Sequence, residues 1–341
     1  MDLEAYSKNL TDFIAGGYIT SAIMIGIDLG LFEQLKKNDG PVTSQQLADA
    51  CNLKDRYVQE WLGCMVSCRI VSMDASDKYF IPESLKPGLN ALGFAFFIPV
   101  MDVLTTKVKD CFKKDGSKGF GYTEMPKEVV DAIENKTADP DEAVNQLLKP
   151  LPKPLESKAT ILDLGCGGGN LTRALRKRFK DADIYGADLS ETAITKAEAL
   201  SKSVKNLKFV KTDITRMPAD WTRKFDWVIL YDVLHDLPDN VNAMKEVHRV
   251  LKDDGAVSIV DPNIHSKHRD NIGDANTAGV GYAISSVICL PSSSSIEGAA
   301  CHGIGWGTEN KEAFLKSSGW KIHAKGNVDS PFAYNFTCGK A

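Results

Sequence analysis

The stretch Ile161-Leu162-Asp163-Leu164-Gly165-Cys166-Gly167-Gly168-Gly169-Asn170-Leu171-Thr172 decides the fold. A short apolar run, expected to be a strand, leads into a glycine-rich turn, and a helix is expected to follow at once. Because glycine has no Cβ and tolerates positive φ, such a turn lets a small ligand approach the backbone closely. In an α/β sheet, that ligand binds at the carboxyl end of the strand.

The spacing of the glycines separates two kinds of ligand. Gly165, Gly167 and Gly169 complete the pattern G-x-G-x-G, whereas the dinucleotide pattern G-x-G-x-x-G lacks its third glycine because Asn170 stands there. Asp163 lies two residues before the first glycine, where a carboxylate would repel a pyrophosphate and attract a cation. S-adenosylmethionine carries a sulfonium and an ammonium and no phosphate, so it fits better than a nicotinamide dinucleotide.

Three further apolar runs are expected to form strands that end in an acid, at Asp188, Asp213 and Asp232. Asp is disfavoured within strands. A single Asp at a strand end is often a cap or turn former, and this alternative stays open for Asp213. Asp188 lies 19 residues after Gly169, about where an acidic side chain accepts hydrogen bonds from ribose hydroxyls.

Together these residues resemble the cofactor motifs of class I S-adenosylmethionine-dependent methyltransferases, over about half of the chain. The resemblance implies that the glycine turn and Asp163 face the methionine part of the cofactor, and that Asp188 binds its ribose. It places Asp213 near the adenine amino group, with Ile214 and Leu189 beside the adenine. The residues assigned to the cofactor are Asp163, Gly165, Gly167, Gly169, Asp188, Leu189, Asp213, Ile214 and Tyr231.

The rest of residues 156–341 fits a seven-stranded, Rossmann-like α/β sheet. A fifth strand is expected at 256–262, and two closing strands at 320–324 and 333–338 are close enough in sequence to pair antiparallel. Residues 263–307 are rich in Gly and Ser and predict a long loop. Before this domain, residues 96–155 predict a helical connector that ends in a stiff proline-rich linker.

Residues 1–95 predict a mainly helical winged-helix domain. Helical spacing runs over 22–32, a capping box is expected at Thr43–Gln46, and a further helix is expected over 55–67. A hairpin follows, with strands at 69–73 and 78–81. The stretch holds eight Lys or Arg against twelve Asp or Glu, which argues against DNA binding because a DNA reader needs a basic face.

This arrangement resembles the N-terminal domain of small-molecule O-methyltransferases, in which a winged helix mediates dimerisation and helps to wall the substrate pocket. A subgroup of winged-helix methyltransferases of undefined substrate is similar in the phrases at 26–32 and 56–62. The resemblance therefore implies a homodimer that forms through the N-terminal domain.

Composition and charge limit the partners. The 341 residues carry 41 basic and 45 acidic side chains, which does not favour nucleic acid or an anionic membrane surface. The eight cysteines lack a framework spacing, and Cys64 and Cys68 have no second pair, so no metal site is expected. The acidic N-terminus is unlike a secretory signal, and the apolar run 19–32 is too short to span a bilayer. A cytoplasmic protein without membrane segments is expected.

His235 is the best candidate for a general base. It follows the fourth strand, on the same sheet edge as the glycine turn, and its ordinary pKa near 6.5 suits proton transfer. The His235-Asp236 phrase resembles the segment that carries the catalytic histidine in plant-type small-molecule O-methyltransferases, although Leu237 replaces their tryptophan. Many class I methyltransferases carry a histidine here without a base role, so both roles stay open. His302, in the glycine-rich stretch 298–307, is the second candidate.

The sequence thus predicts an enzyme that transfers a methyl group from S-adenosylmethionine to a small molecule by in-line displacement, with a hydroxyl oxygen as the favoured acceptor. Methylation of an amine or a heteroaromatic nitrogen, or of carbon, remains an alternative. Two other classes also remain: a winged-helix regulator that only senses the cofactor, and a nicotinamide oxidoreductase.

Overall fold

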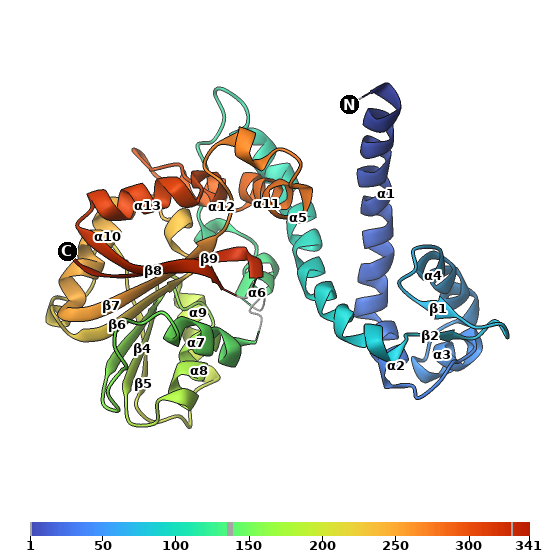
Figure 1. Ribbon diagram of the computed structural model, residues 1–341, viewed down its shortest axis with the longest axis horizontal. Coiled ribbons are helices and arrows are strands. Elements are labelled where there is room, and N and C mark those ends of the chain that lie inside the picture. Colours follow the sequence, from blue (N-terminus) through green and yellow to red (C-terminus); the bar gives the residue numbers. More distant parts are fainter. Residues whose placement is uncertain (1, 135–138, 329) are drawn as a thin grey trace. The chain divides into compact units, whose positions relative to one another are not determined.

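A computed structural model describes residues 2–134, 139–328 and 330–341, and the chain divides into two units, Met1–Ile98 and Pro99–Ala341 (Figure 1). Each unit is described by itself. The predicted boundaries at residues 95 and 155 stay predictions.

The first unit is a winged helix preceded by a long helix. Its elements are α1 (Leu3–Asp28), α2 (Leu31–Lys37), α3 (Ser44–Ala50), α4 (Asp55–Ser67), β1 (Ser72–Met73), β2 (Tyr79–Phe80) and a 3-10 segment (Glu83–Phe96). The capping box opens α3: the Thr43 hydroxyl accepts from the Gln46 N–H, and the Gln46 side chain accepts from the Thr43 N–H. The antiparallel pair β1–β2 forms the expected hairpin.

The helical spacing over 22–32 does not form one helix. Gly30 adopts φ +72° between the end of α1 and the start of α2, and this left-handed residue breaks the helical path. Residues on both sides still pack into one core, because Leu31 and Phe32 are buried and Ile27 packs against them. The spacing therefore identified the buried face and missed the break.

α1 is longer than the apolar run predicted, since it begins at Leu3, where the Asp2 carboxylate accepts from the Ala5 N–H. Two helical stretches of the described chain, Leu3–Asp28 and Glu83–Cys111, are long and apolar enough to cross a membrane by length and composition alone. Buried core helices and signal sequences meet the same criterion, so this is weak evidence for a span. The absence of a membrane segment stays a prediction.

Gly26 is where α1 packs against α4. The Trp61 indole N–H donates to the Ala22 carbonyl at 2.8 Å, and a Cβ on Gly26 would lie 2.4 Å from the Trp61 ring. We expect Gly26→Ala to lower the free energy of unfolding by about 2–3 kcal/mol, measured by urea denaturation of the full chain. Gly16→Ala, on the same helix with open space around it, is the control and should instead add about 0.5–1 kcal/mol. Equal stability of the two variants would contradict the packing argument.

The second unit contains the seven-stranded sheet. Its strands are β3 (Thr160–Leu164), β4 (Asp183–Asp188), β5 (Leu207–Lys211), β6 (Phe225–Tyr231), β7 (Leu251–Pro262), β8 (Trp320–Val328) and β9 (Ser330–Lys340). Their order is β5-β4-β3-β6-β7-β9-β8. The first five are parallel, and β9 pairs antiparallel with both β7 and β8. The predicted sheet is confirmed.

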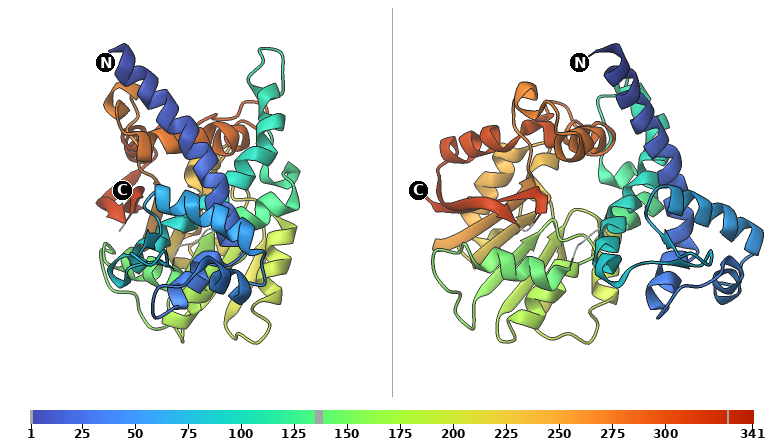
Figure 2. Two further views of the ribbon diagram at one scale, coloured as in Figure 1. Left: turned by 90° about the vertical axis from the view of Figure 1, so that its right-hand side faces the viewer. Right: turned by 45° about the vertical axis from the view of Figure 1, so that its right-hand side comes forward.

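Helices cover both faces of this sheet (Figure 2). One core lies under α7 (Pro140–Leu148) and α8 (Asn170–Arg178), and the other under α10 (Asn240–Val250) and α13 (Thr308–Ser317). Alternate residues of β3 supply the two cores: Ile161 packs in the first, and Leu162 and Leu164 pack in the second. The remaining helices are α5 (Phe97–Cys111), α6 (Lys127–Glu134), α9 (Glu191–Ala199), α11 (Val280–Val287) and α12 (Cys289–Ser293).

The stretch 263–307 is more helical than its composition predicted. It contains α11, α12, a π-helix (Ala275–Gly279) and two short 3-10 turns. Its serines stabilise this structure: the Ser285 hydroxyl accepts from the Ile304 N–H at 2.9 Å, and the Ser293 hydroxyl accepts from the Gly303 N–H at 3.1 Å. Both serines are buried. The prediction of a long loop here is wrong, because these buried serines join α11 and α12 to the returning chain.

Candidate active site

The glycine turn has the backbone that the motif requires. Gly165, Gly167 and Gly169 have φ of +78°, +49° and +76°, all in the left-handed region. A Cβ on Gly165 would lie 2.5 Å from Val233, and one on Gly169 would lie 2.7 Å from the Phe209 ring. Larger residues at these two positions would therefore be strained twice, by conformation and by contact.

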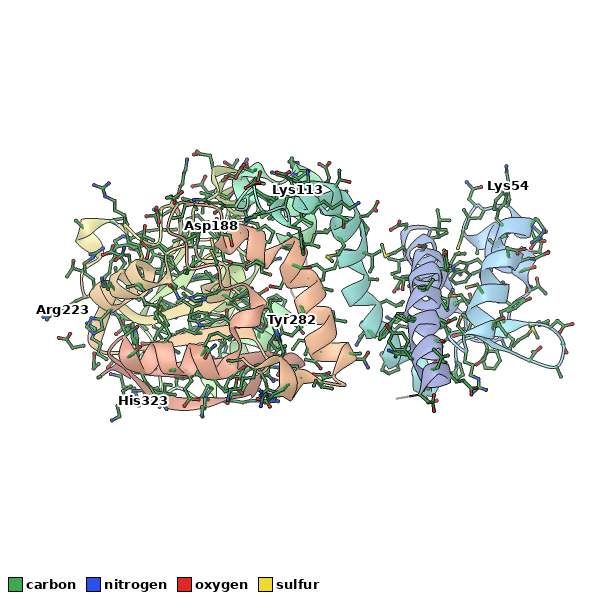
Figure 3. All side chains as sticks on the ribbon, turned by 90° about the horizontal axis from the view of Figure 1, so that it is seen from above. Lys54, Lys113, Asp188, Arg223, Tyr282 and His323 are labelled. Atoms are coloured by element: carbon green, nitrogen blue, oxygen red, sulfur yellow. The ribbon has the colours of Figure 1, made fainter. Side chains whose placement is uncertain are left out.

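Asp188 lies beside this turn, at the carboxyl end of β4 (Figure 3). Its carboxylate accepts from the Gly167 N–H at 2.9 Å and from the Ser190 N–H at 2.8 Å. Burial raises the pKa of Asp188, while these backbone bonds oppose the rise. The next residue, Leu189, is a large apolar side chain that is 58% exposed. The turn is thus contacted by a carboxylate whose next residue in sequence is an exposed apolar side chain.

Asp163 is buried below the turn. Its carboxylate accepts from the Thr172 hydroxyl of α8 at 2.6 Å, and burial raises its pKa to about 7. In the structure, the buried Asp163 is therefore hydrogen-bonded to the first turn of α8. Its role toward the methionine part of a cofactor stays a prediction.

The other residues assigned to the cofactor lie at or just past the ends of β5 and β6. Asp213 is exposed, and its carboxylate accepts from both the backbone N–H and the hydroxyl of Thr215 at 2.8 Å. These contacts are the ones expected if Asp213 only stabilises a turn after the strand, the alternative that the sequence left open. Ile214 and Tyr231 are half-buried and pack against the two cores. Their contacts with a cofactor stay predictions.

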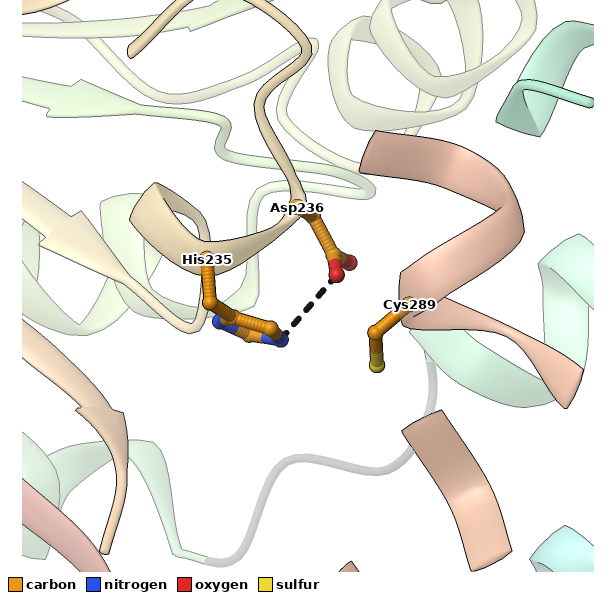
Figure 4. Close-up of side chains that lie close together, drawn as sticks. All are labelled: His235, Asp236 and Cys289. Carbon is orange, nitrogen blue, oxygen red and sulfur yellow. Dashed lines mark ion pairs between the residues drawn. The ribbon is translucent and has the colours of Figure 1, made fainter. Parts of the chain in front are cut away.

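His235 lies in the 3-10 turn Leu234–Asp236 after β6, buried between two carboxylates. Its Nδ1 is 3.0 Å from Asp261 Oδ1. On the other side of the ring, its Nε2 is 3.1 Å from Asp236 Oδ1, and Figure 4 shows this second contact. Burial alone lowers the pKa of His235, but Asp236 and Asp261 outweigh it and hold the pKa well above its ordinary value. The two carboxylates therefore favour the protonated form of the histidine in this arrangement.

Three further side chains complete the site, which we call the His235 cluster: His235, Asp236, Asp261, Tyr122, Lys311 and Cys289. The Tyr122 hydroxyl donates to Asp236 Oδ2 at 2.5 Å. Lys311 Nζ lies 3.4 Å from Asp261 Oδ2 and donates to the Pro262 carbonyl at 2.8 Å. Cys289 lies beside the histidine, and burial raises the pKa of its thiol to about 12.

The donor atoms of His235, Asp236 and Cys289 all lie within 4.8 Å of one another, so their spacing could hold a metal ion. A histidine that binds a metal must offer an unprotonated nitrogen, and a cysteine must lose its proton. Here both ring nitrogens already face carboxylates, and burial disfavours the thiolate. We therefore interpret the group as a hydrogen-bonded acid–base cluster.

Sequence reasoning did not connect Asp261, Tyr122 or Lys311 with His235. Asp261 could have been found, because it is another acid at the carboxyl end of a parallel strand. Tyr122 and Lys311 come from distant segments whose local sequence carries no signal for this contact. His302, the second candidate base, stacks on Trp306 with ring centroids 3.9 Å apart, and burial lowers its pKa.

Comparison with known families agrees with this geometry. The family model described as "Methyltransferase domain" matches residues 155–315, and the model of the Rv2258c-like winged HTH domain matches residues 17–86. The demethylmenaquinone methyltransferase of Staphylococcus carnosus (strain TM300) is 36% identical over 95 residues, which cover 28% of this chain and 39% of the relative. The chain thus spans less than half the length of the curated relatives that it matches.

Solved structures share the fold over nearly the whole chain. Human N-acetylserotonin methyltransferase, in complex with SAM, is 15% identical with a TM-score of 0.70, covering 100% of this chain and 99% of that one. The mitomycin 7-O-methyltransferase MmcR is 17% identical with a TM-score of 0.66, covering 99% and 98%. CalO1, a methyltransferase in calicheamicin biosynthesis solved with SAH, is 14% identical with a TM-score of 0.68 and full coverage of both chains.

These findings define the class of the protein. Its fold is that of the S-adenosylmethionine-dependent methyltransferases with an N-terminal winged helix, and the predicted class is confirmed. Residues 155–315 match the methyltransferase-domain family model. The matched domain and the neighbours solved with SAM or SAH support S-adenosylmethionine as the cofactor.

Proposed function

We propose that the protein is a methyltransferase that uses S-adenosylmethionine to methylate a hydroxyl oxygen of a small molecule. One observation carries the proposal: within a matched methyltransferase domain, the left-handed glycine turn is joined by the Asp188 carboxylate at the edge where β3 and β4 end. A turn of glycines with a carboxylate beside it suits a cationic donor. When bound, S-adenosylmethionine supplies a methyl group already activated on a sulfonium.

The residues at the turn fit the cofactor. The Asp188 carboxylate, which accepts from the Gly167 N–H, has lone pairs left to accept from two ribose hydroxyls, and the exposed Leu189 offers a flat base an apolar surface. Because the donor is activated, positioning of the acceptor oxygen in line with the methyl group and sulfur supplies much of the catalysis. These residues bind and orient; they do not react.

His235 is the proposed proton acceptor. It lies just past the end of β6, the strand next to β3, so it is on the same sheet edge as the glycine turn. Asp261 accepts from Nδ1 and fixes the ring, which leaves Nε2 for the acceptor hydroxyl once that hydroxyl takes the place of Asp236. The hydroxyl then gives its proton to Nε2 of the neutral histidine as its oxygen takes the methyl group, and Asp261 stabilises the cation formed.

The test is methyl transfer to a panel of phenols and alcohols, with radiolabelled S-adenosylmethionine and product detection by mass spectrometry. Transfer to oxygen is the expected result. Transfer only to amines would still mean that the protein is a methyltransferase, but its acceptor would be nitrogen and not oxygen. Cofactor binding without transfer to any acceptor or metabolite extract, together with a DNA gel shift at low salt, would favour the regulator instead.

We also propose that the protein is a homodimer joined through its N-terminal unit. α1 carries large exposed apolar side chains that recur with helical spacing, at Tyr6, Leu10, Phe13, Ile14 and Tyr18. A second copy of the same helix would cover this face.

Phe13→Glu is expected to convert a dimer of twice 37.2 kDa into a monomer in size-exclusion chromatography with light scattering. Phe13 is 59% exposed, so a charge there costs the isolated unit little and disfavours an apolar interface. Lys8→Gln is the control, since it changes the net charge equally on the opposite side of the helix. A wild type that is monomeric at micromolar concentration would contradict the proposal.

A further inference from the structure

A fully buried lysine lies behind the histidine. Lys311 is on the first turns of α13, with 0% of its side chain exposed. Its Nζ donates to the Pro262 carbonyl and faces Asp261, whose side chain is also completely buried. Burial lowers the pKa of Lys311, and Asp261 opposes that shift. An uncompensated buried charge is strongly destabilising, so these two groups depend on each other.

The contacts run in one line from Lys311 to the histidine. Lys311 faces Oδ2 of Asp261 at 3.4 Å, and the other oxygen, Oδ1, is 3.0 Å from His235 Nδ1. The carboxylate is thus shared between two basic side chains that come from different elements, α13 and the turn after β6. A change at either basic side chain alters how strongly Asp261 holds the other.

The charges around this line are unbalanced. Three carboxylates surround the two basic side chains: Asp261 from β7, and Asp232 and Asp236 from the chain around His235, at 3.9 and 3.1 Å from its Nε2. Tyr122 and Cys289 face the cluster as neutral groups, and Glu309 lies two residues before Lys311 on α13. Without the lysine, His235 would face the three carboxylates with no second basic group of the cluster beside it.

We infer that Lys311 is a positioning residue that acts through Asp261 to keep the proton of His235 removable. This inference rests on the proposed role of His235 as proton acceptor. Lys311 takes up part of the charge of Asp261, so the carboxylate orients the imidazole without holding its proton as tightly as a free carboxylate would. An opposite charge at contact distance shifts a titration by about 1–3 pH units, so loss of the lysine is a measurable change.

Lys311→Met tests the inference without cofactor or acceptor. The protein is labelled with ¹⁵N at histidine, its six histidines are followed by NMR as a function of pH, and the His235 signal is assigned by its loss in His235→Gln. The titration midpoint of His235 should rise by about one pH unit or more in Lys311→Met. It should stay near the wild-type value in Lys311→Arg and in the control Lys316→Met, an exposed lysine of the same helix.

Two outcomes overturn the inference. One is a Lys311→Met titration that coincides with the wild type. The other is an equal shift in the Asp261→Asn background, which would mean that the effect does not pass through Asp261. Lys311→Gln, which keeps a donor for the Pro262 carbonyl, replaces the methionine variant if that variant does not fold. Failure of the proposed role of His235 is a separate result, because it would be seen as an unchanged kcat in His235→Gln.

Discussion

Asp188→Ala is expected to weaken the binding of S-adenosylmethionine by roughly 30- to 1,000-fold, which corresponds to about 2–4 kcal/mol. The carboxylate has two tasks. In the structure it accepts from the Gly167 N–H and so holds the glycine turn, and it is placed to accept from the ribose hydroxyls of the cofactor. Alanine removes both, and the amide of Gly167 loses its partner.

Isothermal titration calorimetry with S-adenosylmethionine measures this effect. Asp183→Ala is the matched control, because Asp183 is the exposed first residue of the same strand, β4, at the opposite edge of the sheet. Its affinity should equal that of the wild type. If Asp188→Ala bound S-adenosylmethionine as tightly as the wild type, or if the wild type gave no heat of binding, the assignment of the cofactor site to this sheet edge would be wrong.

His235→Gln is expected to lower kcat for a hydroxyl acceptor by about 10²–10⁴-fold and to leave the affinity for S-adenosylmethionine within about twofold. Glutamine keeps hydrogen-bonding capacity toward Asp261 but cannot take up a proton. The control is His323→Gln, an exposed histidine on β8 (Figure 3). A variant that retains its kcat would mean that His235 is structural, the role left open by the sequence.

The same histidine predicts the pH dependence of the rate. Asp236 and Asp261 hold the pKa of His235 well above 6.5, and a base works only in its neutral form. The value of kcat/KM should therefore rise with pH through an apparent pKa above 6.5, and His235→Gln should remove this limb. The limb belongs to the coupled His235–Asp236 pair rather than to one group. A profile already level at pH 6 would contradict the assignment.

The parallel strands were predictable because each is a short apolar run that ends at an acid or a glycine turn. Ile161 to Leu164 and Asp183 to Asp188 are such runs, and their ends fix the sheet edge that carries the site. The break at Gly30 was not predictable from helical spacing, because residues on both sides pack into one core. The helices within 263–307 were also missed, since composition does not show that Ser285 and Ser293 have buried partners.

The candidate site was predictable in part. The turn glycines, Asp188 and His235 follow from local motifs, whereas the contact of His235 with Asp236 depends on a 3-10 turn that follows Asp232 at φ +60°. The side chains of two consecutive residues do not generally contact each other, so this contact could not be inferred from the sequence. Tyr122 and Lys311 reach the cluster only through tertiary packing, and no periodicity or spacing encodes that.

The order of the strands in the sheet also affects how the chain folds. β8 and β9 are consecutive and pair with each other, so they can form a hairpin from local contacts alone. The inner pair β3–β6 instead joins Thr160 to Asp226, 66 residues later, and must wait for a large loop to close. We therefore expect the hairpin to form early and to dock through β9 onto β7 last. Until then β7 is an open edge, the point where an incomplete chain is most prone to aggregate.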